Sequence, residues 1–316
     1  MPTDVNLALD LGGTNLRLGL VSRDLSLLES CRVSSRTPSD SEPIEWLSFH
    51  IHKFLKQYND TGRYAVRSMS LGVPSTVDYH REKILSTTNL PAWSNIPAKR
   101  LLEDRFQIPL ALDRDTNYLI LNDMWQLEIF DSSAVVGIYV GTGLGNAVVL
   151  DGTIWRGAHG VSAELGHLPW PGVHGKCGCG NSSCVEIVAS GLALERIGQE
   201  FYPSEPLPEI FVRHGAEPPV SSFIDVLGKA IACEINIVDP NIVILGGGVL
   251  SMTGFPYHTL EMSILSSTRK PLPSDGISFF YSSNSQFNGL IGGTIASPFF
   301  ETSCDVSHRS HERSLG

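Results

Sequence analysis

Residues 5–14, VNLALDLGGT, combine an apolar run of strand length with an aspartate and a pair of glycines. The apolar run predicts a short buried strand that ends near the aspartate, and residues 12–14 predict a tight turn. Leu16, Leu18 and Leu20 then follow at every second position. This alternation predicts a returning strand, and therefore a hairpin around the glycine turn.

The same order of elements returns about 130 residues further along the chain. Residues 135–140 are apolar, residues 141–145 read Gly-Thr-Gly-Leu-Gly, and residues 147–150 are apolar again. Two such strand–turn–strand units suggest a duplicated architecture.

Other stretches predict the elements between and after these hairpins. Apolar residues at helical spacing predict helices over residues 43–58, 98–106 and 223–238. Short apolar runs predict strands over residues 69–73, 108–112 and 242–245, and a segment rich in Pro, Glu and Gly predicts a loop or insertion over residues 198–220. Strands that alternate with helices indicate an α/β fold.

The length and the charge of the chain limit its function. Its 316 residues correspond to about two domains. The net charge of −10 and the lack of a Lys/Arg-rich stripe argue against a nucleic-acid partner. No apolar run approaches the roughly 18 residues that a membrane helix needs, and the N-terminal sequence lacks the basic start of a secretory signal. We therefore expect a cytoplasmic protein that binds neither nucleic acid nor membrane.

Three glycine-rich turns form a candidate nucleotide site, because glycine lets several backbone N–H groups point toward one phosphate. Thr14 and Thr142 add hydroxyl donors, and Asp10 is placed to hold Mg²⁺ through water. The third turn, residues 246–248, follows the strand predicted over residues 242–245 and is expected to open a helix. The alternative is that each glycine group is only a hairpin turn or a helix cap. The candidate residues are Asp10, Gly12, Gly13, Thr14, Gly141, Thr142, Gly143, Gly246, Gly247 and Gly248.

A second pattern predicts a metal site. His167, Cys177, Cys179 and Cys184 crowd one imidazole and three thiols into a short segment with glycines between the sulfurs. Three thiolates and one imidazole satisfy tetrahedral Zn²⁺ and leave no open position, which predicts a structural zinc ion. The alternative is that these residues are ordinary thiols.

Several of these segments resemble the signatures of the ROK family (repressors, open reading frames, sugar kinases). They are Asp10–Asn15, Gly160–His167 and Cys177–Glu186, and with Leu245–Gly248 the resemblance covers nearly the whole chain. The resemblance implies an actin/hexokinase-like (ribonuclease H-like) α/β fold of two domains. It also implies that ATP and a sugar bind in an active-site cleft between them.

The resemblance further implies the domain bounds. A smaller N-terminal α/β domain would span residues 1–116 and be completed by a C-terminal helix near residues 290–303. A larger α/β domain with the zinc loop would span residues 117–289. Residues 304–316 would form a polar tail.

The roles of individual site residues follow from the same resemblance. Asp115 matches the family's catalytic aspartate, which would accept the proton of a sugar hydroxyl as that hydroxyl attacks the γ-phosphate. Glu164, His167 and Glu186 match positions that contact sugar hydroxyls, and Asn89 is a further candidate for such a contact. His167 would bind zinc through one ring nitrogen and the sugar through the other.

The residue before the catalytic aspartate departs from the family pattern. The usual pair is Asn-Asp, whereas here it is Arg114-Asp115. Arg114 would either contact the hydroxyl that separates allose from glucose or pair with a nearby acid.

Within the family, further segments resemble the members that phosphorylate D-allose. These segments are Ser86–Pro91, Arg114–Asp115, Thr153–Gly160, Arg269–Pro273 and Phe287–Gly289. We therefore expect an ATP-dependent kinase that phosphorylates the 6-hydroxyl of D-allose, with glucose, N-acetylmannosamine and fructose as alternative substrates.

A non-catalytic sugar-responsive regulator is a second alternative. Because the first glycine turn begins near residue 10, we expect no helix-turn-helix domain ahead of it. The family commonly forms oligomers, so the resemblance also implies a homo-oligomer, most simply a dimer.

Overall fold

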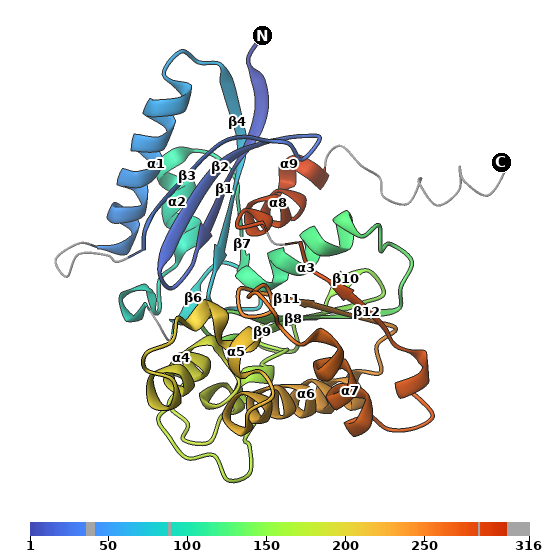
Figure 1. Cartoon of the computed structure of the whole chain (residues 1–316). Helices are drawn as coiled ribbons and strands as arrows, with labels where there is room; N and C mark the ends of the chain where they lie inside the picture. The colour runs from blue at the N-terminus through green and yellow to red at the C-terminus, as the bar shows by residue number, and fades with distance from the viewer. Residues whose placement is uncertain (36–41, 88–89, 284, 302–316) are drawn as a thin grey trace. The chain divides into compact units, whose positions relative to one another are not determined.

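The computed structural model describes residues 1–35, 42–87, 90–283 and 285–301 of the chain. These residues form two compact units, and each unit has a sheet and helices of its own. The first unit comprises Met1–Asn122 together with the described residues from Gln286 onward, and the second comprises Asp123–Ser285. Figure 1 labels the elements of both units.

The first unit is built on a five-stranded sheet in the order β3-β2-β1-β4-β7. β1 and β2 are antiparallel with Leu11 opposite Leu16, which confirms the predicted hairpin, whereas β4 is parallel to β1 and to β7. The strands are β1 (Thr3–Leu11), β2 (Asn15–Ser22), β3 (Leu27–Ser34), β4 (Tyr64–Val73) and β7 (Leu110–Arg114). A separate two-stranded sheet consists of β5 (Ser75–Val77) and β6 (Ile84–Thr87).

Helices cover both faces of this first sheet, because successive residues of β1 point to opposite sides. Leu7 and Leu9 are buried in a core with α1 and α2, whereas Ala8 is buried against Leu290 of α8. Figure 1 shows α8 beside β1, and α8 also packs against β4. The helices of this unit are α1 (Pro43–Asn59), η1 (Pro91–Trp93), α2 (Ala98–Phe106), α8 (Asn288–Ile295) and α9 (Pro298–Glu301).

The second unit has a five-stranded sheet in the order β10-β9-β8-β11-β12. β8 and β9 form the second predicted hairpin, with Val140 opposite Leu144, and β11 is parallel to β8 and β12. The strands are β8 (Ala134–Val140), β9 (Leu144–Leu150), β10 (Thr153–Ile154), β11 (Ile242–Gly246) and β12 (Ser278–Tyr281). The helices are α4 (Gly191–Phe201), α5 (Ile210–His214), α6 (Pro218–Val238), α7 (Tyr257–Ser267), η2 (Leu165–His167), η3 (Val185–Ile187), η4 (Leu207–Glu209) and η5 (Ser274–Gly276).

One apolar core holds this second unit together. Alternate residues of β8, such as Val136 and Ile138, are fully buried with Leu227 and Ile231 of α6. The helical spacing of those α6 residues was the basis for predicting a helix there, and the structure confirms it with an earlier start at Pro218. Among the described residues, the structure contains no helix that combines the length and the apolar character of a membrane span.

α3 (Asp115–Gln126) belongs to both units, because the boundary between them falls after Asn122. Its first residue is the predicted catalytic aspartate, which directly follows the last residue of β7.

The structure corrects three predictions of secondary structure. The segment 198–220 is partly helical, since α4 ends in it, α5 lies within it and α6 starts at Pro218. Residues 246–248 lead into a hydrogen-bonded turn and not into a helix. The C-terminal helix is divided into α8 and α9, with Pro298 at the start of α9, because proline disrupts the interior of a helix. Residues 302–316, including the predicted polar tail, lie outside the described residues.

Candidate functional site

Asp10 is the penultimate residue of β1 and is paired with a cation on the neighbouring strand. Arg17 lies opposite it in the hairpin, and Arg17 Nη1 is 2.9 Å from Asp10 Oδ2. α8 begins close to the same carboxyl group, because a Cβ on Gly289 would lie 3.1 Å from Asp10 Cγ. The turn itself is closed by a hydrogen bond from Gly12 N to Asn15 O (2.8 Å). Asp10 is thus fixed beside the turn that was predicted to bind phosphate.

The protonation of Asp10 reflects two opposing effects. Burial raises the pKa of the Asp10 carboxyl above its ordinary value, and the Arg17 guanidinium opposes that rise. A carboxyl with a raised pKa binds its proton more tightly in the folded than in the unfolded protein. The free energy of unfolding therefore falls as the pH rises from the ordinary pKa to the raised one.

We expect Arg17→Met to raise the pKa of Asp10 further, because it removes the nearest positive charge while burial remains. The measurement is a titration of the Asp10 carboxyl ¹³C shift in wild type and variant. Arg67→Met is the matched control, since Arg67 pairs with Asp4 on the exposed part of the same sheet. An Asp10 titration that is the same in Arg17→Met and wild type would contradict this prediction.

Asp115 lies at the junction of β7 and α3, and the preceding residues hold that junction. Asp113, 3 % exposed, accepts hydrogen bonds at Oδ1 from Arg114 N and from Asn117 Nδ2, both at 2.8 Å. Arg81 Nε lies 3.5 Å from the same oxygen. Asp115 is half-buried in the first turn of α3, where the helix N-terminus favours a negative charge. Asp115 is therefore presented at a helix N-terminus by a backbone that Asp113 holds in place.

The second glycine turn joins β8 to β9 and is held by the N-terminus of α4. Gly141 N donates to Gly143 O within the turn (3.0 Å). From α4, Gly191 N donates to Gly141 O (2.8 Å), and Leu192 N donates to Thr142 O (3.1 Å). A Cβ at position 191 would lie 2.3 Å from Gly141 O, so this backbone contact requires glycine there. The turn therefore has a fixed shape and leaves the Thr142 side chain exposed.

The third glycine group lies against this second turn. Gly247 has a φ of +101°, and a Cβ there would lie 2.5 Å from Val140 O. Val249 N donates to the same carbonyl oxygen at 3.0 Å. Two of the three predicted nucleotide-binding turns are therefore adjacent at the C-terminal ends of β8 and β11, where open α/β sheets commonly bind ligands. The remaining predicted turn, which follows Asp10, belongs to the other unit.

The residues predicted to contact a sugar are anchored on the strand that leaves the second turn. Glu186 Oε2 accepts a hydrogen bond from Leu144 N at 2.9 Å. A Cβ on Gly143 would lie 2.5 Å from the same carboxylate oxygen. Gly166, between Glu164 and His167, approaches Leu144 O so closely that a Cβ would lie 2.3 Å from it. The beginning of β9 thus supports both segments that carry the predicted sugar contacts.

The contact between Gly143 and Glu186 yields a prediction. A methyl group at position 143 would displace the Glu186 carboxylate, because the two groups cannot occupy the same space. We expect Gly143→Ala to raise the dissociation constant of the sugar about 10–100-fold, in line with the roughly 1.5–3 kcal/mol of a lost charged hydrogen bond. Calorimetric titration with sugar and without nucleotide measures this effect.

Gly141→Ala is the matched control for that experiment. A Cβ at position 141 would meet no atom within 4 Å among the residues that the structure describes. Sugar affinity should therefore stay at the wild-type value in Gly141→Ala. Equal losses of affinity in both alanine variants would show that the turn, and not the Glu186 contact, determines sugar binding.

The four predicted metal ligands come together in the second unit. The ligand atoms of His167, Cys177, Cys179 and Cys184 all lie within 4.8 Å of one another. His167 Nδ1 is 3.6 Å from Cys177 Sγ, and Cys179 Sγ is 3.6 Å from Cys184 Sγ. Tetrahedral zinc with Zn–S bonds of about 2.3 Å would place its sulfurs roughly 3.8 Å apart. The spacing and the donor set therefore fit a structural Zn²⁺ ion.

The most strongly shifted of these thiols would have to lose its proton to bind a metal. Burial, together with the neighbouring thiols, raises the pKa of Cys184 to about 12. The Cys184 thiol is therefore protonated at neutral pH when no metal is near, and binding of a metal would release its proton.

His167 presents its two ring nitrogens to different groups. Nδ1 faces the sulfur cluster, and Nε2 lies 3.7 Å from Glu164 Oε2. A carboxylate behind a metal-bound imidazole commonly fixes the orientation of the ring. The geometry brings Glu164 and the second nitrogen of His167 to one place, as a shared sugar contact requires. Their contact with a sugar stays a prediction.

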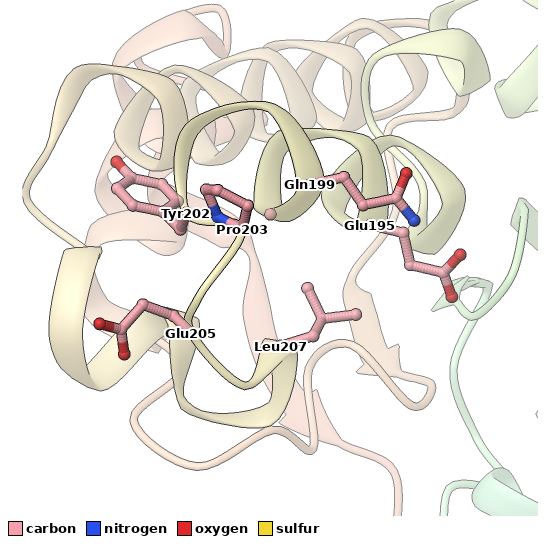
Figure 2. Close-up of a pocket in the computed structure, with 7 residues that line it drawn as sticks. Glu195, Gln199, Tyr202, Pro203, Glu205 and Leu207 are labelled. Carbon is pink, nitrogen blue, oxygen red and sulfur yellow. The ribbon is translucent and has the colours of Figure 1, made fainter.

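Two further residues, Asn89 and Arg114, were predicted to contact the sugar. Asn89 lies outside the described residues. Arg114 is buried, at 7 % exposure. Figure 2 shows a surface pocket beside α4, lined by residues such as Glu195, Tyr202 and Leu207, and none of its lining residues was predicted as a site residue.

Sequence analysis missed residues that support the site. Arg17 could have been found, because a hairpin with a short turn places it directly opposite Asp10. Arg81 and Asp113 gave no such signal, since their approach depends on the loop between β5 and β6. Asn146 of β9 donates a hydrogen bond to Glu234 of α6, and these residues are 88 positions apart and meet only in the folded unit.

Comparisons with known proteins agree on one family. The model of the ROK family matches residues 6–297. The chain is 31% identical over 257 residues to an N-acetyl-D-glucosamine kinase of Pectobacterium atrosepticum, which covers 76% of this chain and 82% of that protein. It is 28% identical to a glucokinase of Thermotoga maritima, over 79% of this chain and 83% of that protein.

A solved structure confirms the predicted fold class. The ROK family glucokinase of Streptomyces griseus, crystallised with glucose and AMPPNP, matches with a TM-score of 0.76 and 22% identity. The match covers 92% of this chain and 98% of that one. The hexokinase-like α/β fold expected from the sequence is therefore present.

Proposed function

Because the chain belongs to the ROK family, we propose that it is a sugar kinase that transfers the γ-phosphate of ATP to the 6-hydroxyl of a hexose. One observation supports this most directly. At the start of β9, the turn proposed for phosphate and the carboxylate proposed for sugar are in contact, through Gly143, Leu144 and Glu186. A kinase needs these two binding functions side by side, because the phosphoryl group moves from one ligand to the other.

Asp115 is the proposed general base. A sugar hydroxyl is a weak nucleophile, and a carboxylate that accepts its proton makes attack on the γ-phosphate easier. The position of Asp115 in the first turn of α3 stabilises the ionised form that this step requires. Asp113 and its partners hold the backbone that presents Asp115.

The remaining residues bind and orient the reactants. Asp10 and the turn after it would hold Mg²⁺ through water, and this ion would supply charge neutralisation on the phosphates. The exposed Thr142 hydroxyl, with the backbone of its turn, would bind phosphate oxygens. Glu164, His167 and Glu186 would orient the sugar hydroxyls, and the zinc ligands would keep that segment rigid.

D-allose is the proposed substrate. The segments that resemble allose-phosphorylating members support it, and so does Arg114 in place of the usual asparagine. A guanidinium offers five N–H donors in a fixed planar array, whereas an asparagine amide offers two donors and an acceptor. A buried Arg114 directly before the base would thus prefer a different arrangement of hydroxyls from that of glucose.

N-acetyl-D-glucosamine is the second candidate substrate. The relative from Pectobacterium atrosepticum, at 31% identity, is named for this sugar and favours it. Glucose, N-acetylmannosamine and fructose complete the set of sugars to compare.

The test measures ADP release with these five sugars at equal concentration, and ³¹P NMR identifies the phosphorylated position. We expect the highest kcat/KM with D-allose and a 6-phosphate product. A higher value with N-acetyl-D-glucosamine would establish the second candidate in its place. Sugar binding without ADP release from any of them would contradict the kinase proposal and favour a sugar-responsive regulator.

A further inference from the structure

A buried polar side chain lies in the middle of the second unit's core. Asn146 of β9 is 1 % exposed, and the adjacent residues Ala147 and Val148 are also buried. Its Nδ2 donates to Glu234 Oε1 of α6 at 2.5 Å. Its Oδ1 accepts a hydrogen bond from Leu165 N at 3.0 Å. The side chain therefore connects α6 through β9 to the first residue of η2.

Burying the Asn146–Glu234 pair in an apolar core costs free energy. Glu234 is 7 % exposed and lies between the fully buried Ile231 and Ile235 on α6. Burying a carboxylate and an amide costs free energy, and apolar residues of similar volume often stabilise a core at least as well. Stability alone does not account for the pair. Its second effect is to hold the backbone N–H group of Leu165.

That group belongs to the backbone of η2. Leu165 N is fixed by Asn146, and the next residue, Gly166, rests directly on Leu144 O of the same strand. Glu164 precedes these two residues, and His167 follows them. A shift of the Leu165 backbone would thus move a predicted sugar carboxylate and a predicted zinc ligand together.

We infer that Asn146 and Glu234 are positioning residues that hold η2 in the geometry needed for zinc and sugar. Asn146 acts directly on the Leu165 amide, and Glu234 fixes the orientation of the Asn146 side chain from α6. The inference rests on the proposed function for its sugar part. Its zinc part depends only on the ligand cluster and on the hydrogen bonds of this network.

Two substitutions test the network from its two ends. Asn146→Ala removes both hydrogen bonds, and we expect it to speed zinc release to a chelator about 10–100-fold, the usual effect of losing a partner behind a metal ligand. We expect the sugar KM to rise about tenfold with a smaller change in kcat, because Asp115 is untouched. Glu234→Gln keeps an acceptor for Asn146 Nδ2, and it should behave like wild type.

Amide hydrogen exchange provides a readout that is independent of catalysis. The Leu165 amide should exchange faster in Asn146→Ala than in wild type, whereas Glu234→Gln should leave it protected. Should Asn146→Ala fail to fold, Glu234→Leu takes its place, since it removes the α6 end and keeps the bond to Leu165. Glu234→Leu should then show a smaller acceleration of zinc release in the same direction.

The matched control is Asn241→Ala. Asn241 also bridges two groups with its side-chain oxygen, accepting from Ser133 Oγ (2.6 Å) and Ala134 N (3.2 Å) at the opposite end of β8. It should lower stability without changing zinc release or the Leu165 amide. Equal zinc release in Asn146→Ala and wild type, or equal effects of Asn146→Ala and Asn241→Ala, would overturn the inference. If wild type phosphorylates no sugar, the proposed function fails while zinc release and exchange still decide this inference.

Discussion

Asp115→Asn is expected to lower kcat by about 10²–10⁴-fold, the range that a general base contributes. The asparagine amide occupies nearly the same volume but cannot accept the proton of the attacking hydroxyl. Because Asn is tolerated at a helix N-terminus, α3 should still begin at the same residue. The loss should therefore appear in turnover, measured by ADP release, and not in sugar affinity or in the circular dichroism of the fold.

Two further variants sharpen this test. Asp115→Glu keeps a carboxylate but moves it by one methylene, and it should retain more activity than the asparagine variant. Asp104→Asn removes an exposed acid from α2 of the same unit and should turn over at the wild-type rate. A folded Asp115→Asn protein with kcat near wild type would remove Asp115 from the mechanism.

Cys184→Ser is expected to abolish zinc binding and, with it, most sugar affinity. Cys184 is 1 % exposed and is two residues before Glu186, so the loss of one ligand releases the segment that carries a predicted sugar contact. Zinc content, measured by mass spectrometry, should fall from about one ion per chain to a small fraction. We expect the unfolding temperature to drop by roughly 10 °C and the sugar dissociation constant to rise at least about tenfold.

The chain supplies its own control for the metal prediction. Cys233 is an exposed cysteine on α6 of the same unit, outside the ligand cluster. Cys233→Ser should keep the wild-type zinc content, unfolding temperature and sugar affinity. A Cys184→Ser protein that retains wild-type zinc would overturn the ligand assignment, and so would freshly purified wild type that contains none.

The parts of the fold that sequence predicted best are those with strong local patterns. The alternating leucines of β2 predict a strand, and the apolar spacing of α1 predicts a helix. Both elements form where expected. The prediction of a loop over residues 198–220 is wrong because α5 has only five residues, too few to show a helical spacing of apolar side chains, and prolines lie at the starts of η4 and α6. Gly247 was misread because its φ of +101° is set by the approach of Val140, a strand neighbour more than 100 residues earlier.

In the candidate site too, residues close together in the sequence could be predicted, whereas pairs far apart in the sequence could not. Three zinc ligands lie within eight residues, so their spacing alone indicated a cluster, and the structure brings them together with His167. The hydrogen bonds of Asn146 could not be foreseen, because an asparagine in an apolar strand has no local partner. Such long-range pairs are specified only once α6 and β9 have packed against each other.

The first unit draws its strands from the beginning of the chain and α8 from the end. Asn6 of β1 donates to Thr294 of α8 across 288 residues of sequence, and Gly289 lies against Asp10. During translation, the ribosome must therefore release almost the whole polypeptide before this sheet can gain its covering helix. Residues 123–285 face no such delay, so we expect them to fold first on a nascent chain, with the N-terminal strands left incomplete until synthesis ends.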